Sequence, residues 1–246
     1  MKNILALLII TFILSLQFNN GMAQNIENIE LVDGIHKMEL PISDGNKLRC
    51  SASFPVLNGE GNVPLILALH YGGEVVPYFG FNYLTLLAEP ALKDLGAFII
   101  APDCPGNGWT DEISEKAITE LLQYVIEFWP VDTSKIVVTG FSMGGFGAWY
   151  FGSKYPDIFC AAIPVAGRPT GDFEIQIPVY ALHGQFDEIV DIEPTKTEIK
   201  KLKKSGLNAR LYVIQGLSHY QTGEYVSSLK KTTKWLKEIW KLREDE

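Results

Sequence analysis

Residues 136–145, IVVTGFSMGG, combine a strand pattern with a glycine-flanked serine. Four residues typical of a buried strand come first, the pattern Gly140-x-Ser142-x-Gly144 follows, and a helical pattern begins at Gly144. A strand, a sharp turn and a helix in this order hold a serine in strained backbone geometry at the end of a sheet. We expect glycine at both flanking positions because a Cβ atom there would clash with neighbouring backbone. The alternative is a helix N-cap serine in a glycine-rich turn.

Apolar runs and amphipathic segments alternate along the rest of the chain, which predicts a mostly parallel sheet with helices on both faces. Strands are expected at residues 65–69, 97–100, 136–139, 160–165, 179–182 and 210–214, and helices at 81–94, 114–129, 144–154, 192–204 and 226–242. Residues 35–41 and 47–56 flank a turn and predict an antiparallel hairpin at one edge. Ligands of such sheets bind at the carboxyl ends of the strands.

An acidic residue follows the predicted strand at residues 179–182. The sequence continues as HGQFD, and a carboxylate at Asp187 would orient a histidine and stabilise its charged form. Asp191 is the second candidate for this role. The alternative for Asp187 is a cap of the helix that begins near Asp191.

The general base is expected to be a histidine, because histidine accepts and returns a proton near neutral pH. The chain has four, at positions 36, 70, 183 and 219. His70 and His183 stand at strand ends beside glycines, where packing or loop hydrogen bonding explains them. His219 alone follows the last predicted strand, after both Ser142 and Asp187. The alternative for His219 is a surface loop residue.

A glycine-containing loop follows the strand at residues 65–69 and reads HYGGE. Acyl transfer needs two backbone N–H groups aimed at a developing oxyanion. Met143, next to the serine, would supply one of them, and Gly72 in this loop would supply the other. The alternative for this loop is a plain glycine turn.

Residues 132–145, DTSKIVVTGFSMGG, resemble the α/β-hydrolase superfamily. They are similar to small exported esterases related to feruloyl esterases and polyhydroxybutyrate depolymerases, and to the phospholipase/carboxylesterase group. The resemblance covers about residues 35–242, and the order Ser142, Asp187, His219 matches the order these hydrolases use. It implies ester hydrolysis through an acyl-enzyme, without a metal or organic cofactor. Tyr71 replaces the first glycine of the usual Leu-His-Gly-x-Gly loop, so Tyr71 is an alternative to Gly72 as the second donor.

The substrate is expected to be a small ester or an ester linked to a polysaccharide, because the site should be open. The predicted elements and short loops between Ser142 and Asp187 leave no room for a cap domain. Trp109, in a loop after another strand, would stack on a sugar or aromatic acyl group, and Tyr71 is a further pocket candidate. The alternative for Trp109 is packing within its loop. Other interpretations of the chain are a peptidase or thioesterase of the same fold, or a non-catalytic binding module.

The first residues have the layout of a secretory signal peptide. Lys2 precedes an apolar run at residues 4–16, and Gly21-Met22-Ala23 offers small residues for cleavage after Ala23. The run is short for a membrane span, although an uncleaved anchor is the alternative. We therefore expect an exported protein with a signal peptide at residues 1–23, one domain at residues 24–246 and no stable membrane insertion after cleavage.

Charge and cysteine content limit the partners further. The formal net charge of −8 repels phosphate backbones and makes nucleic acid an improbable partner. The chain has three cysteines, Cys50, Cys104 and Cys160. Because this number is odd, at least one thiol of an exported chain stays unpaired. We interpret them as buried small residues and leave one disulfide open.

Overall fold

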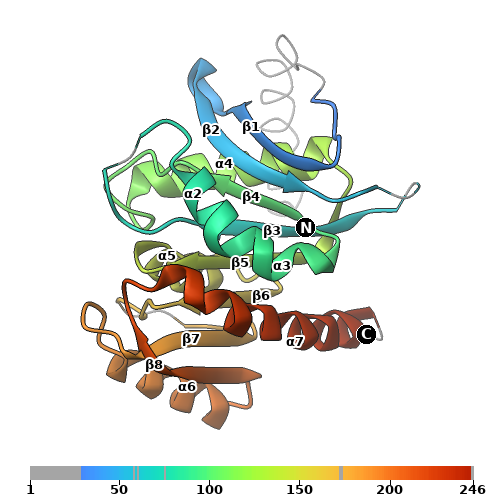
Figure 1. The fold of residues 1–246 in the computed structure, drawn as a ribbon. Coiled ribbons are helices and arrows are strands. Elements are labelled where there is room, and N and C mark those ends of the chain that lie inside the picture. Colours follow the sequence, from blue (N-terminus) through green and yellow to red (C-terminus); the bar gives the residue numbers. More distant parts are fainter. Residues whose placement is uncertain (1–28, 58, 60, 75, 172–173, 245–246) are drawn as a thin grey trace, which may run out of the picture. The chain divides into compact units, whose positions relative to one another are not determined.

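The computed structural model of the protein describes residues 29–244, except 58, 60, 75 and 172–173. The expected signal peptide at residues 1–23 lies outside the described residues. The compact unit that begins at Val32 contains one eight-stranded sheet with the order β1-β2-β4-β3-β5-β6-β7-β8 (Figure 1). The strands are β1 (Gly34–Pro41), β2 (Lys47–Phe54), β3 (Val63–Leu69), β4 (Phe98–Pro102), β5 (Val131–Phe141), β6 (Ala161–Val165), β7 (Val179–Phe186) and β8 (Ala209–Ser218).

The sheet is parallel from β4 to β8, and β1 and β2 extend it as an antiparallel hairpin at one edge. Both features confirm the predicted architecture. The helices are α2 (Gly80–Tyr83), α3 (Glu89–Leu92), α4 (Glu112–Phe128), α5 (Met143–Lys154), α6 (Glu193–Lys204) and α7 (Val226–Glu244). No helix in the described part of the chain is both long and apolar enough to span a bilayer.

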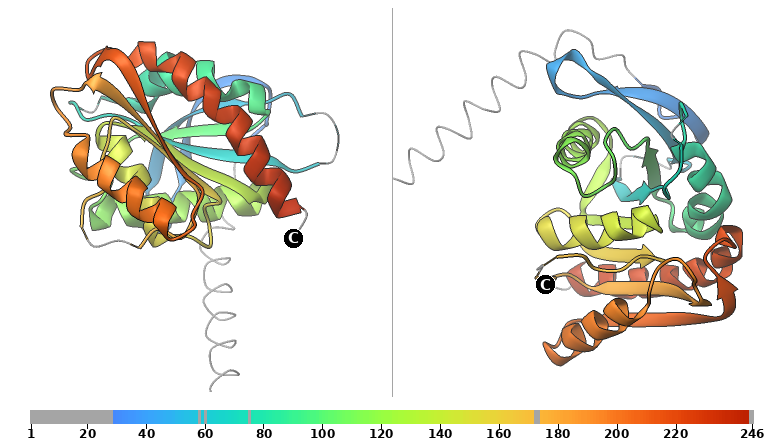
Figure 2. Two further views of the ribbon diagram at one scale, coloured as in Figure 1. Left: turned by 90° about the horizontal axis from the view of Figure 1, so that it is seen from below. Right: turned by 90° about the vertical axis from the view of Figure 1, so that its left-hand side faces the viewer.

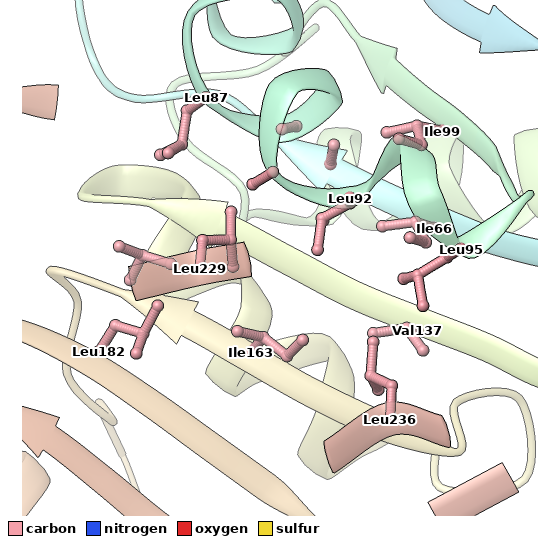
Figure 3. Close-up of a cluster of buried hydrophobic side chains, with 14 of the residues drawn as sticks. Ile66, Leu87, Leu92, Leu95, Ile99, Val137, Ile163, Leu182, Leu229 and Leu236 are labelled. Atoms are coloured by element: carbon pink, nitrogen blue, oxygen red, sulfur yellow. The ribbon is translucent and has the colours of Figure 1, made fainter. Parts of the chain in front are cut away.

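Helices cover both faces of the sheet. Figure 2 shows α4, α5 and α6 on one face and α2, α3 and α7 on the other. Between α7 and the sheet lies a buried apolar cluster (Figure 3). Five neighbouring strands contribute Ile66, Ile99, Val137, Ile163 and Leu182, and the helical segments contribute Leu87, Leu92, Leu95, Leu229 and Leu236. Full burial of each of these side chains contributes roughly 1.5–3 kcal/mol, so this layer fixes the sheet that carries the site.

Two local differences from the expected elements have physical causes. The helix expected at residues 81–94 is interrupted by a π-helical turn at Leu84–Ala88. Pro90 follows this turn, and its missing N–H group removes one helical hydrogen bond there. Strand β8 continues to Ser218, four residues past the expected end, and Ser218 pairs with Phe186 of β7. His219 therefore follows a strand directly.

Candidate active site

The turn after β5 holds Ser142 in a strained conformation. Its backbone angles are φ 54° and ψ −114°, a region that non-glycine residues rarely occupy. A Cβ atom at Gly140 would lie 2.2 Å from the carbonyl oxygen of Gly144, and one at Gly144 would lie 1.9 Å from the carbonyl oxygen of Leu69. Only glycine fits either position, as predicted, and the serine stands where β5 passes into α5.

The imidazole of His219 joins Ser142 to Asp187. Nε2 of His219 lies 2.8 Å from Oγ of Ser142. Nδ1 lies 2.9 and 2.8 Å from the two carboxylate oxygens of Asp187. His219 is 6% exposed and its ring lies 5.3 Å from that of Phe141, so the imidazole is held between the sheet and the cavity. The three residues singled out from the sequence are thus in hydrogen-bond contact.

Asp187 is a buried and fully engaged carboxylate, with a side chain that is 1% exposed. Its Oδ1 accepts backbone N–H groups from Ile189 at 3.1 Å and Val190 at 2.8 Å, and its Oδ2 lies 3.3 Å from Nε2 of His183. Burial raises the pKa of Asp187, but hydrogen bonds from His183, His219 and Val190 outweigh it and hold the pKa well below its usual range. The residue is therefore a carboxylate across the neutral range.

The other acidic residues near the site take different positions. Asp191 is exposed, and its Oδ1 accepts the backbone N–H of Glu193 at 3.0 Å at the start of α6. Asp191 thus contacts the start of α6, whereas Asp187 contacts His219. Glu188 accepts the backbone N–H of His219 at 3.1 Å and fixes the main chain on which that imidazole stands. The sequence did not indicate this contact.

The loop after β3 is anchored by His70. Its Nδ1 donates to the carbonyl oxygen of Tyr71 at 2.6 Å, and its Nε2 accepts the backbone N–H of Cys104 at 3.0 Å. Burial lowers the pKa of His70, which keeps this ring neutral. Tyr71 and Gly72 line the same cavity as Ser142. The structural role expected for His70 agrees with these contacts.

Trp109 does not face the cavity, and the prediction that it stacks on a substrate is wrong. The side chain is 1% exposed, and its indole N–H donates to the carbonyl oxygen of His70 at 2.8 Å. A buried indole N–H needs such an acceptor, and the backbone of the loop after β3 supplies it. Trp109 therefore supports that loop from beneath.

A cavity of about 670 Å³ opens beside Ser142 and His219. Part of its rim is apolar and exposed, with Leu86 at 45%, Ile189 at 54% and Tyr220 at 73% exposure. The polar residues Gln221, Thr222 and Glu224 line it as well. Among the described residues that line the cavity, Glu224 is the one carboxylate, and none is a lysine or an arginine. The cavity therefore disfavours a group that carries negative charge.

The three cysteines are free thiols and all are buried. Burial raises the pKa of each thiol, which suppresses the reactive thiolate. This confirms their interpretation as small buried residues. Within the described ranges, no cluster of three or more histidine, cysteine or acidic residues is arranged to hold a metal ion.

The sequence profile of the dienelactone hydrolase family matches residues 105–236, which is more than half of the chain. The chain belongs to the dienelactone hydrolase family. The matched residues include Ser142, Asp187 and His219. Solved structures that share the fold of this chain include esterases and peptidases. The family match confirms the resemblance read from the residues around the serine.

Two curated proteins and one solved structure are similar to this chain. Feruloyl esterase B of Talaromyces stipitatus is 31% identical over 117 residues, covering 43% of this chain and 32% of that protein. Acetylxylan esterase A of Aspergillus oryzae is 28% identical over 129 residues, covering 47% of this chain and 41% of that protein. The crystal structure of a thermostable esterase superposes with a TM-score of 0.71 at 23% identity, over 85% of this chain and 64% of that one, which shows the shared fold. The chain spans about half or less of the length of the curated relatives it matches.

Proposed function

We propose that this member of the dienelactone hydrolase family is a carboxylic ester hydrolase that works through Ser142, His219 and Asp187. The observation that carries the proposal is the unbroken series of contacts from the Asp187 carboxylate through the imidazole to the Oγ atom of Ser142. Nε2 of His219 takes the proton of Oγ as this oxygen attacks the ester carbonyl carbon. The same nitrogen returns the proton to the leaving alcohol. Water then hydrolyses the acyl-enzyme with His219 again as base.

The oxyanion of the tetrahedral intermediate is held by backbone N–H groups. Met143 is the first residue of α5, where N–H groups have no acceptor within the helix. The second donor comes from the loop after β3, with Gly72 favoured and Tyr71 as the alternative. Gly72 lies close to Met143, since a Cβ atom built on it would be 3.8 Å from the Met143 side chain. The contacts of His70 hold this loop in place before substrate binds.

The substrate class that fits best is an uncharged ester of modest size, free or attached to a polysaccharide. The apolar rim accepts an acyl or aromatic group, and the carboxylate of Glu224 disfavours a substrate with its own negative charge nearby. Relatives named acetylxylan esterase and feruloyl esterase point to the same class. Tyr71 takes the aromatic contact in the cavity that Trp109 does not provide.

A side-by-side assay separates this proposal from its rivals. We expect kcat/KM for 4-nitrophenyl acetate to exceed that for an aminoacyl nitroanilide and for an acyl thioester. Ser142→Ala should lower kcat on the ester by about 10³-fold or more. Preferential amide or thioester cleavage would favour the peptidase or thioesterase of the same fold. A folded wild-type protein without any of the three activities would favour a non-catalytic binding module.

We also propose that the protein is exported, with residues 1–23 as signal peptide and residues 24–246 as the domain. The basic start, the apolar run and the small residues before the cut support this proposal. Mass spectrometry of protein collected outside the cytoplasm should find an N-terminus at Gln24. An intact Met1 there would contradict cleavage.

A further inference from the structure

A second histidine touches the carboxylate that faces His219. His183 stands in β7, is fully buried, and places Nε2 2.9 Å from the carbonyl oxygen of Val190 and 3.3 Å from Oδ2 of Asp187. Oδ2 is also the oxygen that lies 2.8 Å from Nδ1 of His219. The two imidazoles therefore share one oxygen of the acid.

The neighbours of His183 show which ring nitrogen carries a proton. Carbonyl and carboxylate oxygens only accept hydrogen bonds, so Nε2 carries a proton. Nδ1 is buried and has no hydrogen-bond partner among the described residues. An unpaired buried nitrogen costs stability, and an apolar side chain of similar shape would avoid that cost. Packing alone therefore does not account for a histidine at this position.

The strand that carries His183 packs closely against its neighbour. A Cβ atom at the adjacent Gly184 would lie 2.5 Å from the carbonyl oxygen of Leu217 in β8, so the two strands are in close contact there. Val190, whose carbonyl accepts from His183, also donates its own N–H to Asp187 at 2.8 Å. The imidazole thus ties the strand to both ends of the segment between Asp187 and Val190.

We propose that His183 is a positioning residue for Asp187, donating from Nε2 to Oδ2 and to the Val190 carbonyl so that the carboxylate keeps the orientation that faces His219. This inference rests on the proposed function. Without the donor, the carboxylate rotates away from the geometry that holds the imidazole toward Ser142. The effect should appear in kcat and leave KM unchanged, because His183 is not among the residues that line the cavity.

Matched substitutions of His183 test the proposal. His183→Phe keeps a ring but has no donor. His183→Asn has a shorter side chain, so its amide does not reach the position of the imidazole Nε2. His183→Gln places an amide N–H near that position. We expect the Phe and Asn variants to lose about 10- to 100-fold in kcat on 4-nitrophenyl acetate at unchanged KM. The Gln variant should stay within about threefold of wild type. If the Phe variant fails to fold, the Asn and Gln pair decides.

Asp187→Ala supplies the background that separates positioning from general destabilisation. If His183 acts through the carboxylate, adding His183→Asn to Asp187→Ala should lower kcat by less than about twofold further. An equal loss in both backgrounds, or folded Phe and Asn variants with wild-type kcat, would overturn the inference. A wild-type protein that neither hydrolyses esters nor reacts with a fluorophosphonate would instead sink the proposed function itself.

Discussion

The Nε2 atom of His219 lies 2.8 Å from the Oγ atom of Ser142, although the two residues are 77 positions apart in the chain. The parallel sheet accounts for this contact, because β5 and β8 end at the same edge. The serine follows one strand and the histidine follows the other.

Replacing the acid should damage catalysis far more than replacing its neighbour in the chain. Asp187→Asn keeps the shape but loses the charge that orients and stabilises the His219 imidazolium, so kcat should fall by about 10³–10⁴-fold. Asp191→Asn is the matched control, because Asp191 is exposed and contacts the start of α6. It should retain kcat within about twofold. Equal losses of kcat in the two variants would mean that Asp187 is not the acid of this site.

Gly144→Ala should disrupt the turn that presents the serine. The added Cβ would lie 1.9 Å from the Leu69 carbonyl oxygen, so the backbone must shift. We expect the free energy of unfolding to fall by about 1–3 kcal/mol and kcat to fall with it. Gly61→Ala, where the new Cβ meets nothing within 4 Å, should be close to neutral in a urea titration. A Gly144→Ala protein as stable and active as wild type would contradict this geometry.

Much of the fold followed from sequence because its strands are buried on both faces and read as continuous apolar runs. The site residues could be predicted from the sequence because the carboxyl ends of parallel strands lie at one edge of the sheet. What could not be predicted depends on side-chain direction. The indole of Trp109 turns inward to the His70 carbonyl, and no local pattern distinguishes this from a solvent-facing ring. The contact of His183 with Asp187 depends on a loop conformation that the sequence does not specify.

Stability should depend on pH through Glu115, which joins α4 to the end of α5. Burial raises its pKa, but hydrogen bonds from Lys154, Tyr150 and Tyr155 outweigh this and lower it. A lowered folded-state pKa means that the stabilisation is present above the unfolded value of about 4.3 and is lost as pH falls below it.

Urea titrations of Glu115→Gln and wild type provide the measurement. The stability difference between them should be largest near about pH 7 and shrink toward about pH 3. Glu112→Gln, at an exposed position in the same helix, is the control and should show little difference at any pH. A Glu115→Gln difference that is constant with pH would argue against an ionised Glu115 in this network.

The thiols should be unreactive in the folded protein. Cys50, Cys104 and Cys160 are all buried and free, so a thiol reagent should label them slowly under native conditions. After unfolding without a reductant, all three should react. Fewer than three reactive thiols in the unfolded chain would indicate a disulfide.

Ser142 is the proposed nucleophile, and covalent labelling can identify it. A fluorophosphonate reacts with a serine only when a neighbouring base activates it. Peptide mass mapping of the labelled wild-type protein should place one adduct on Ser142, and Ser142→Ala should take up no label. An adduct on another residue, equal labelling of Ser142→Ala, or no labelling of folded wild-type protein would show that Ser142 is not an activated nucleophile.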